Sequence, residues 1–240
     1  ADEGLNRRGG IAMIKFHGLA AQTARFLQKE QLSDPVQWAK FVDVYRSQPD
    51  DANQGWRGEY WGKMMRGAAL TYRATKNEKL YSVMVDTIHD LLTTQDELGR
   101  ISTYEVDKEF KCWDMWARKY IMLGMFYFLD VCKSKALAKK IIHAMKRHAN
   151  YIIKHIGNGR KQKTIFETSG IWGSTNSCSI LEPFVKLHVL TGEQKYLDLI
   201  RVAVPGVDEE KVLDRLSGLF DLVVETMYET GRDLHGRYRE

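Results

Sequence analysis

The chain has 240 residues, of which 44% are hydrophobic and 28% are charged, and its formal net charge is +5. This balance excludes intrinsically disordered, collagen-like and low-complexity proteins, and the length suits one compact domain. No apolar run reaches the roughly 18 residues that a membrane span requires, so we expect no membrane partner.

Apolar residues recur at three- and four-residue spacing along the sequence, which predicts an all-α protein whose helices are paired through short turns. In chain order, the expected pairs cover residues 11–29 with 35–48, 61–72 with 80–92, 121–132 with 137–153, and 180–190 with 196–204, and a ninth helix covers 209–230. The turns within the last three pairs begin at residues 75, 132 and 191, which are 57 and 59 residues apart. This spacing indicates an internal helical-hairpin repeat.

Helical hairpins cannot bury their apolar faces alone, and they therefore stack into a solenoid or close into a ring. The helix expected at 121–132 is apolar on nearly every side, whereas its partner at 137–153 has a one-sided apolar stripe. This difference favours two concentric layers. We therefore predict one domain over residues 1–240, built as an incomplete (α/α)6-toroid-like array of about nine helices.

Long linkers connect successive pairs at residues 49–57, 96–113 and 157–176, and long connections in compact domains are usually functional. In a ring, such linkers open on one face. Tryptophan offers an apolar face and one N–H donor, which suits a sugar ring, and nearby carboxylates suit its hydroxyls. Five of the six tryptophans lie in these linkers or in the first turn of the next helix, namely Trp56, Trp61, Trp113, Trp116 and Trp172.

Plainer interpretations of the same residues stay open. The tryptophans could pack neighbouring hairpins together, and acidic residues in a first helical turn also complement the helix dipole. Ten Lys and Arg residues without an acid lie between positions 133 and 163, which is typical of a solvated outer helix or of a nucleic-acid surface. Because no nucleic-acid motif accompanies them, we expect no nucleic-acid partner. Three separated cysteines without a C-x-x-C pair predict no metal site in this segment.

Three short motifs carry a resemblance to a known family. Residues 55–63 read Gly-Trp-Arg-Gly-Glu-Tyr-Trp-Gly-Lys, residues 113–120 read Trp-Asp-Met-Trp-Ala-Arg-Lys-Tyr, and residues 179–183 read Ser-Ile-Leu-Glu-Pro. In this order they resemble the β-L-arabinofuranosidase-like glycoside hydrolases of family GH127. The resemblance runs from about residue 56 to residue 200. It implies the N-terminal part of an (α/α)6 catalytic domain that binds glycan-derived sugars at the ends of its inner helices.

The resemblance implies a retaining mechanism, in which a cysteine held in a zinc site is the nucleophile and a glutamate is the acid/base. The corresponding Glu-x-Cys and Cys-Cys features do not occur here, so the resemblance implies zinc only in a full family-type site. Within this segment we predict no cofactor and two catalytic carboxylates, Glu59 and Asp114. The predicted substrate-binding residues are Trp56, Trp113, Trp116, Tyr120, Trp172, Asn176 and Ser177.

Two other functions are alternatives to an arabinofuranosidase-like hydrolase. One is a non-catalytic carbohydrate-binding or scaffold module, which the missing cysteine features favour. The other is an epimerase or an unsaturated-glycan hydrolase on the same toroid. The expected partners are a carbohydrate and either a second copy of the chain or the remainder of its own polypeptide. The small residues at the amino end make export one expectation, with a cytoplasmic location as the alternative.

Overall fold

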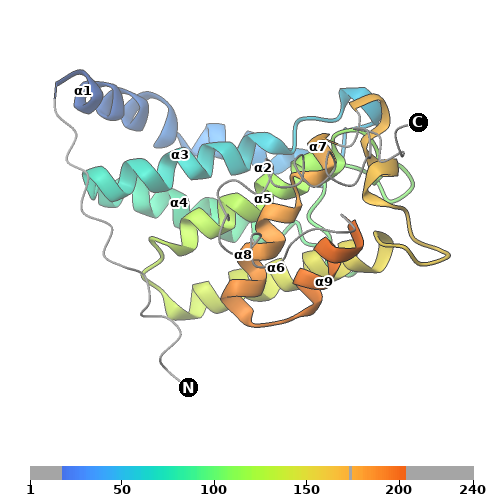
Figure 1. Ribbon diagram of the computed structural model, residues 1–240. Helices are drawn as coiled ribbons and strands as arrows, with labels where there is room; N and C mark the ends of the chain where they lie inside the picture. Colours follow the sequence, from blue (N-terminus) through green and yellow to red (C-terminus); the bar gives the residue numbers. More distant parts are fainter. Residues whose placement is uncertain (1–17, 173–174, 204–240) are drawn as a thin grey trace.

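The computed structural model describes residues 18–172 and 175–203. These residues form helices joined by loops, and they contain no strand beyond two isolated backbone bridges. Figure 1 shows the helices packed lengthwise against one another. In chain order they are α1 (Gly18–Leu27), η1 (Gln28–Leu32), α2 (Pro35–Ser47), η2 (Ala52–Gln54), α3 (Glu59–Thr75), α4 (Glu78–Leu92), α5 (Asp114–Leu129), α6 (Lys135–His155), η3 (Ile165–Trp172), α7 (Thr175–Cys178), α8 (Leu181–Thr191) and α9 (Lys195–Ala203). None of the described helices is long and apolar enough to cross a membrane.

The predicted all-α fold is confirmed, and so are the last three helix pairs, because α3 contacts α4, α5 contacts α6 and α8 contacts α9. For the first pair, the structure shows α1 and α2 with the short π-helix η1 between them. The helix expected from residue 121 begins earlier, at Asp114, and the third linker holds two short helices, η3 and α7, that the sequence did not predict. These short helices have no room for a periodic apolar stripe, and Gly170, with φ 58° and ψ −131°, interrupts η3. The helix expected at 209–230 and the first part of the one expected at 11–29 lie outside the described residues.

Capping residues at the helix ends form the repeated turns. Asn77 Oδ1 accepts the N–H of Leu80 at 3.0 Å at the start of α4, and Ser134 Oγ accepts the N–H of Leu137 at 3.2 Å at the start of α6. Such caps satisfy backbone donors that have no partner inside the helix. Gly192 ends α8 in the left-handed conformation, at φ 70°. Local chemistry therefore fixes each hairpin.

The hairpins arrange their helices in two layers. The first helices of successive pairs, α3, α5 and α8, contact one another in order, and we call them the inner layer. On the other side, α2 contacts α4 and α6 contacts α9, which form the outer layer. Figure 1 shows α3, α5 and α8 following one another across the middle of the molecule. The predicted pair of layers is therefore present in the described part of the chain.

Two glycines let α3 and α5 approach each other closely. A Cβ added to Gly62 would lie 1.9 Å from the backbone oxygen of Tyr120, and one added to Gly124 would lie 2.9 Å from Gly62 Cα. No larger residue fits at either position without moving a backbone. The close approach brings the first turns of α3 and α5 within side-chain reach of each other.

Candidate functional site

The linkers meet at one end of the inner layer, as their placement in the sequence predicts. The backbone N–H of Asp50 in the first linker donates to the oxygen of Thr103 in the second at 3.0 Å, and Thr103 Oγ1 donates to Asp50 Oδ2 at 2.6 Å. Asn176 Nδ2 then donates to the backbone oxygen of Cys112 at 2.5 Å, which joins α7 to the second linker. These bonds gather residues that lie far apart in the sequence around the starts of α3, α5 and α8.

One carboxylate and several aromatic rings form a cluster at this end. Glu59, in the first turn of α3, accepts a hydrogen bond from the indole N–H of Trp116 and forms an ion pair with Lys63 Nζ at 2.8 Å. The ring of Trp116 lies edge-on to Tyr120 at 5.1 Å and to Trp113 at 6.0 Å. Glu59, Trp113, Trp116 and Tyr120 are half-buried. The structure thus brings together four of the predicted site residues.

Trp56 is 37% exposed in the first linker. By contrast, Trp61 is fully buried, and its indole N–H donates to Thr87 Oγ1 of α4 at 3.0 Å. The ring of Trp61 also lies edge-on to Trp38 of α2 at 6.4 Å, so packing between neighbouring hairpins explains Trp61, as the plainer interpretation proposed. For Trp172, the structure places the backbone in η3, and the side chain lies outside the described part.

Asp114 differs from Glu59, because it is fully buried beneath the site. Its carboxylate forms an ion pair with Arg118 Nε at 2.9 Å and accepts hydrogen bonds from Ser102 Oγ at 3.1 Å and from the Phe110 N–H at 2.8 Å. A carboxylate held by so many protein donors is typical of a structural ion pair. The catalytic role of Asp114 stays a prediction, and this geometry does not favour it.

The ion pair of Asp114 belongs to a larger buried network that the sequence analysis did not identify. Arg118 Nη2 also pairs with Glu109 Oε2 at 2.7 Å, and Arg100 Nη1 pairs with the same oxygen at 3.1 Å. Tyr151 of α6 donates a hydrogen bond to the other oxygen of Glu109. In the sequence, only the i, i+4 spacing of Asp114 and Arg118 indicated an ion pair of this network. The rest of the network depends on distant segments.

Asn176 and Ser177 are also buried in the described structure. Asn176 accepts a hydrogen bond from Ser169 Oγ in addition to its bond to the second linker. These contacts hold α7 against its neighbours. The predicted contact of Asn176 and Ser177 with sugar stays a prediction, which the burial of both residues does not favour.

The described residues do not supply a zinc site. No three His, Cys, Asp or Glu side chains among them converge as metal ligands. Burial raises the pKa of the Cys178 thiol to about 12, which opposes the thiolate form that zinc binds. The absence of a cofactor from this segment stays a prediction, and zinc in a full family-type site stays an expectation.

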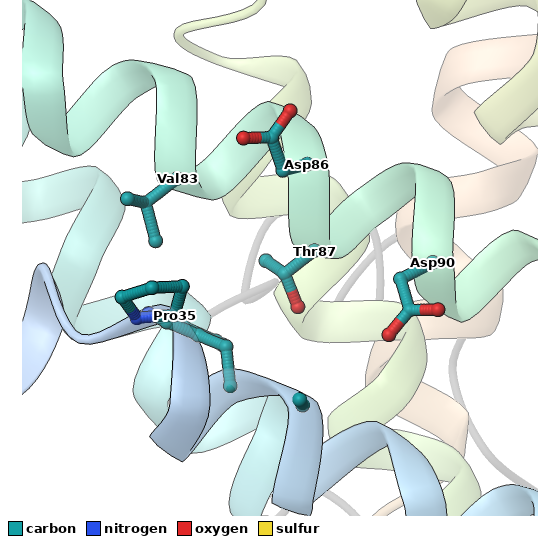
Figure 2. Close-up of a pocket in the computed structure, with 7 residues that line it drawn as sticks. Pro35, Val83, Asp86, Thr87 and Asp90 are labelled. Atoms are coloured by element: carbon teal, nitrogen blue, oxygen red, sulfur yellow. The ribbon is translucent and has the colours of Figure 1, made fainter.

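A separate hollow of about 220 Å³ lies between α2 and α4 in the outer layer. Figure 2 shows Val83 and Thr87 of α4 facing Pro35 of α2, with Asp86 and Asp90 on the same helix. Asp90 is paired with Arg46. Because α2 and α4 form the outer layer, this hollow is not part of the Glu59 cluster.

Comparisons with known proteins agree with the fold. The family model described as "Beta-L-arabinofuranosidase, GH127 catalytic domain" matches residues 17–206. The structure is similar to a GH127 β-L-arabinofuranosidase from Geobacillus stearothermophilus T6, with a TM-score of 0.59 and 15% sequence identity. That similarity covers 82% of this chain but 33% of the other, so the chain spans about a third of its structural relative. No curated protein matches the sequence.

Proposed function

Because the chain belongs to the GH127 β-L-arabinofuranosidase catalytic-domain family, we propose that it forms part of a glycoside hydrolase acting on β-L-arabinofuranoside-type glycans. The observation that carries the proposal is the pairing of Glu59 with Trp116 in the first turns of two inner helices. A carboxylate beside an aromatic ring is the combination that sugar hydroxyls and sugar rings require.

In this proposal, the half-buried rings of Trp113, Trp116 and Tyr120 supply the apolar contact with the sugar. The Trp116 N–H and the Lys63 ammonium hold the two oxygens of Glu59, so that the carboxylate keeps one orientation. Each oxygen retains a lone pair that can accept a sugar hydroxyl. Glu59 would then position the sugar or exchange a proton with the glycosidic oxygen.

A second candidate function is sugar binding without cleavage. It is favoured by the burial of Asp114, because glycoside hydrolysis commonly uses two carboxyl groups that flank the scissile bond. Glu59 alone cannot supply both groups. In this alternative, the same aromatic cluster binds the glycan and the chemistry belongs to other residues.

An assay with nitrophenyl glycosides, including the β-L-arabinofuranoside, separates the two functions. We expect the chain to bind arabinosides and Trp116→Ala to weaken binding by about two- to tenfold, because one aromatic contact contributes roughly 0.5–1.5 kcal/mol. Tyr60→Ala is the matched control, since Tyr60 is an exposed ring on α3 that contacts Phe41 of α2 instead, with ring centroids 6.0 Å apart.

Turnover by the 240-residue chain that is lost in Glu59→Gln would establish hydrolysis and the role of Glu59. Binding without turnover would favour the second candidate. If no glycoside is bound or cleaved, or if Tyr60→Ala and Trp116→Ala behave alike, the proposed site is wrong.

A further inference from the structure

The charges around the Glu59 cluster are mostly positive. On α3, Glu59, Lys63 and Arg66 follow at i, i+4 and i+7, so that they lie along one face of the helix. Lys119 of α5 lies beside Lys63, because both ammonium groups lie over the ring of Tyr120, at 4.8 Å for Lys63 and 4.9 Å for Lys119. This face therefore continues from α3 to α5.

The same face extends to α8. Helix α8 packs against α5, and the charge of Glu182 on α8 raises the pKa of the Lys119 ammonium, as does the charge of Glu59. Glu182 is itself within 3.8 Å of Lys186 Nζ, one helical turn later. We call Glu59, Lys63, Arg66, Lys119, Glu182 and Lys186 the inner-layer charge cluster.

Two of its four cations have no carboxylate partner. Lys63 is paired with Glu59 and Lys186 is near Glu182, but Lys119 and Arg66 form no ion pair within the described residues. The Lys119 ammonium lies 4.7 Å from the centre of the Trp116 ring, and the Arg66 guanidinium lies 5.2 Å from the centre of the Tyr127 ring.

The environment of Lys119 makes this arrangement costly for the free protein. Burial lowers the pKa of the Lys119 ammonium, and the neighbouring charges of Arg66 and Lys63 lower it further, against the opposing effect of Glu182 and Glu59. A half-buried cation beside two others is stabilised by an anion. A neutral sugar has no such group, whereas the carboxylate of a uronic acid does.

We propose, on the premise that the chain binds glycans at this site, that its ligand is an acidic glycan whose carboxylate lies between Lys119 and Arg66. The sugar ring would lie against Trp116, as in the proposed function. Arg66 can donate two parallel N–H bonds to a carboxylate, and Lys119 can add a third charge-assisted bond. The inference names the substrate class as uronate-containing glycans.

The test compares two ligands with the same sugar chain, tetragalacturonate with free carboxylates and its methyl ester, in which a neutral ester replaces each carboxylate. Isothermal titration of the 240-residue protein should show the acid binding at least about tenfold tighter than the ester in low salt, since a charge-assisted hydrogen bond contributes roughly 1.5–3 kcal/mol. The difference should shrink between about 0.05 M and about 1 M salt, as screening predicts.

Variants identify the cations responsible. Lys119→Met and Arg66→Gln should each remove most of the preference for the acid, while Lys119→Arg should retain it. Lys140→Met is the matched control, because Lys140 is an exposed lysine on α6 in the outer layer. Circular dichroism of each variant checks that the fold is intact.

Each outcome decides between the hypotheses. Equal binding of the acid and the ester would overturn the acidic-glycan inference and leave the proposed function standing, provided that arabinosides still bind. An acid preference that survives both substitutions would place the carboxylate at another site. Failure to bind any sugar would overturn the inference and the proposed function together.

Discussion

At the scale of single residues, two carboxylates that look alike in the sequence have different environments. Glu59 and Asp114 each lie in the first turn of an inner helix beside tryptophans. Glu59 is half-buried with an indole donor and a lysine, whereas Asp114 is fully buried with Arg118. An acidic residue in either position is favourable to the helix dipole, so the dipole does not explain why the two carboxylates differ in burial. The difference comes from the neighbouring segments that cover each side chain.

We expect Asp114→Asn to reduce the free energy of unfolding by about 3 kcal/mol or more, because it leaves the buried guanidinium of Arg118 with one carboxylate fewer. Urea titration measures the change. Asp43→Asn is the control, since Asp43 pairs with Arg46 on the surface and its removal should cost less than about 1 kcal/mol. If Asp114→Asn instead keeps its stability and loses turnover, Asp114 is a catalytic residue.

At the scale of elements, the contact between α3 and α5 determines where the cluster forms. Gly62 and Gly124 allow the two helices to touch, and this contact places Trp116 against Glu59. The helices themselves follow from local signals such as the caps at Asn77 and Ser134. Local sequence therefore makes the helices, and two small residues set how closely they pack.

Gly62→Ala should destabilise the protein by about 1–3 kcal/mol, because the added methyl would overlap the backbone oxygen of Tyr120. Gly67→Ala on the same helix is the matched control. Its Cβ would meet no atom within 4 Å, and alanine should stabilise a helix interior by roughly 0.5–1 kcal/mol relative to glycine. Thermal unfolding measures both changes, and two shifts of the same sign would contradict the close contact.

At the scale of the whole molecule, the linkers and the two layers depend on one another. His148 of the outer helix α6 accepts the N–H of Ile101 in the second linker at 3.1 Å through Nδ1. Burial lowers the pKa of His148 well below 6.5, and the charges of Arg118 and Arg100 lower it further. The imidazole is therefore neutral in the folded protein and becomes protonated more readily in the unfolded chain.

This difference makes stability depend on pH. As the pH falls from about 7 to about 5, the unfolded chain binds a proton at residue 148 that the folded protein does not, so the free energy of unfolding should fall by up to about 1.4 kcal/mol per pH unit. His148→Gln keeps an acceptor for Ile101 and should flatten this part of the profile. His143→Gln, at an exposed position of α6, should leave it unchanged. Equal profiles for the two variants would contradict the assignment.

The sequence by itself determined the long helices, the pairing of the later ones and the gathering of the linkers at one end, because periodicity, end signals and repeat spacing can be read directly from one chain. Only the tertiary structure decided which of the residues singled out in the sequence are buried. The predicted site residues Asp114 and Asn176 are bonded to Ser102 and Cys112, and Trp61 is bonded to Thr87. Burial and side-chain pairing depend on which surfaces come into contact in the folded protein, and helical spacing does not predict those contacts.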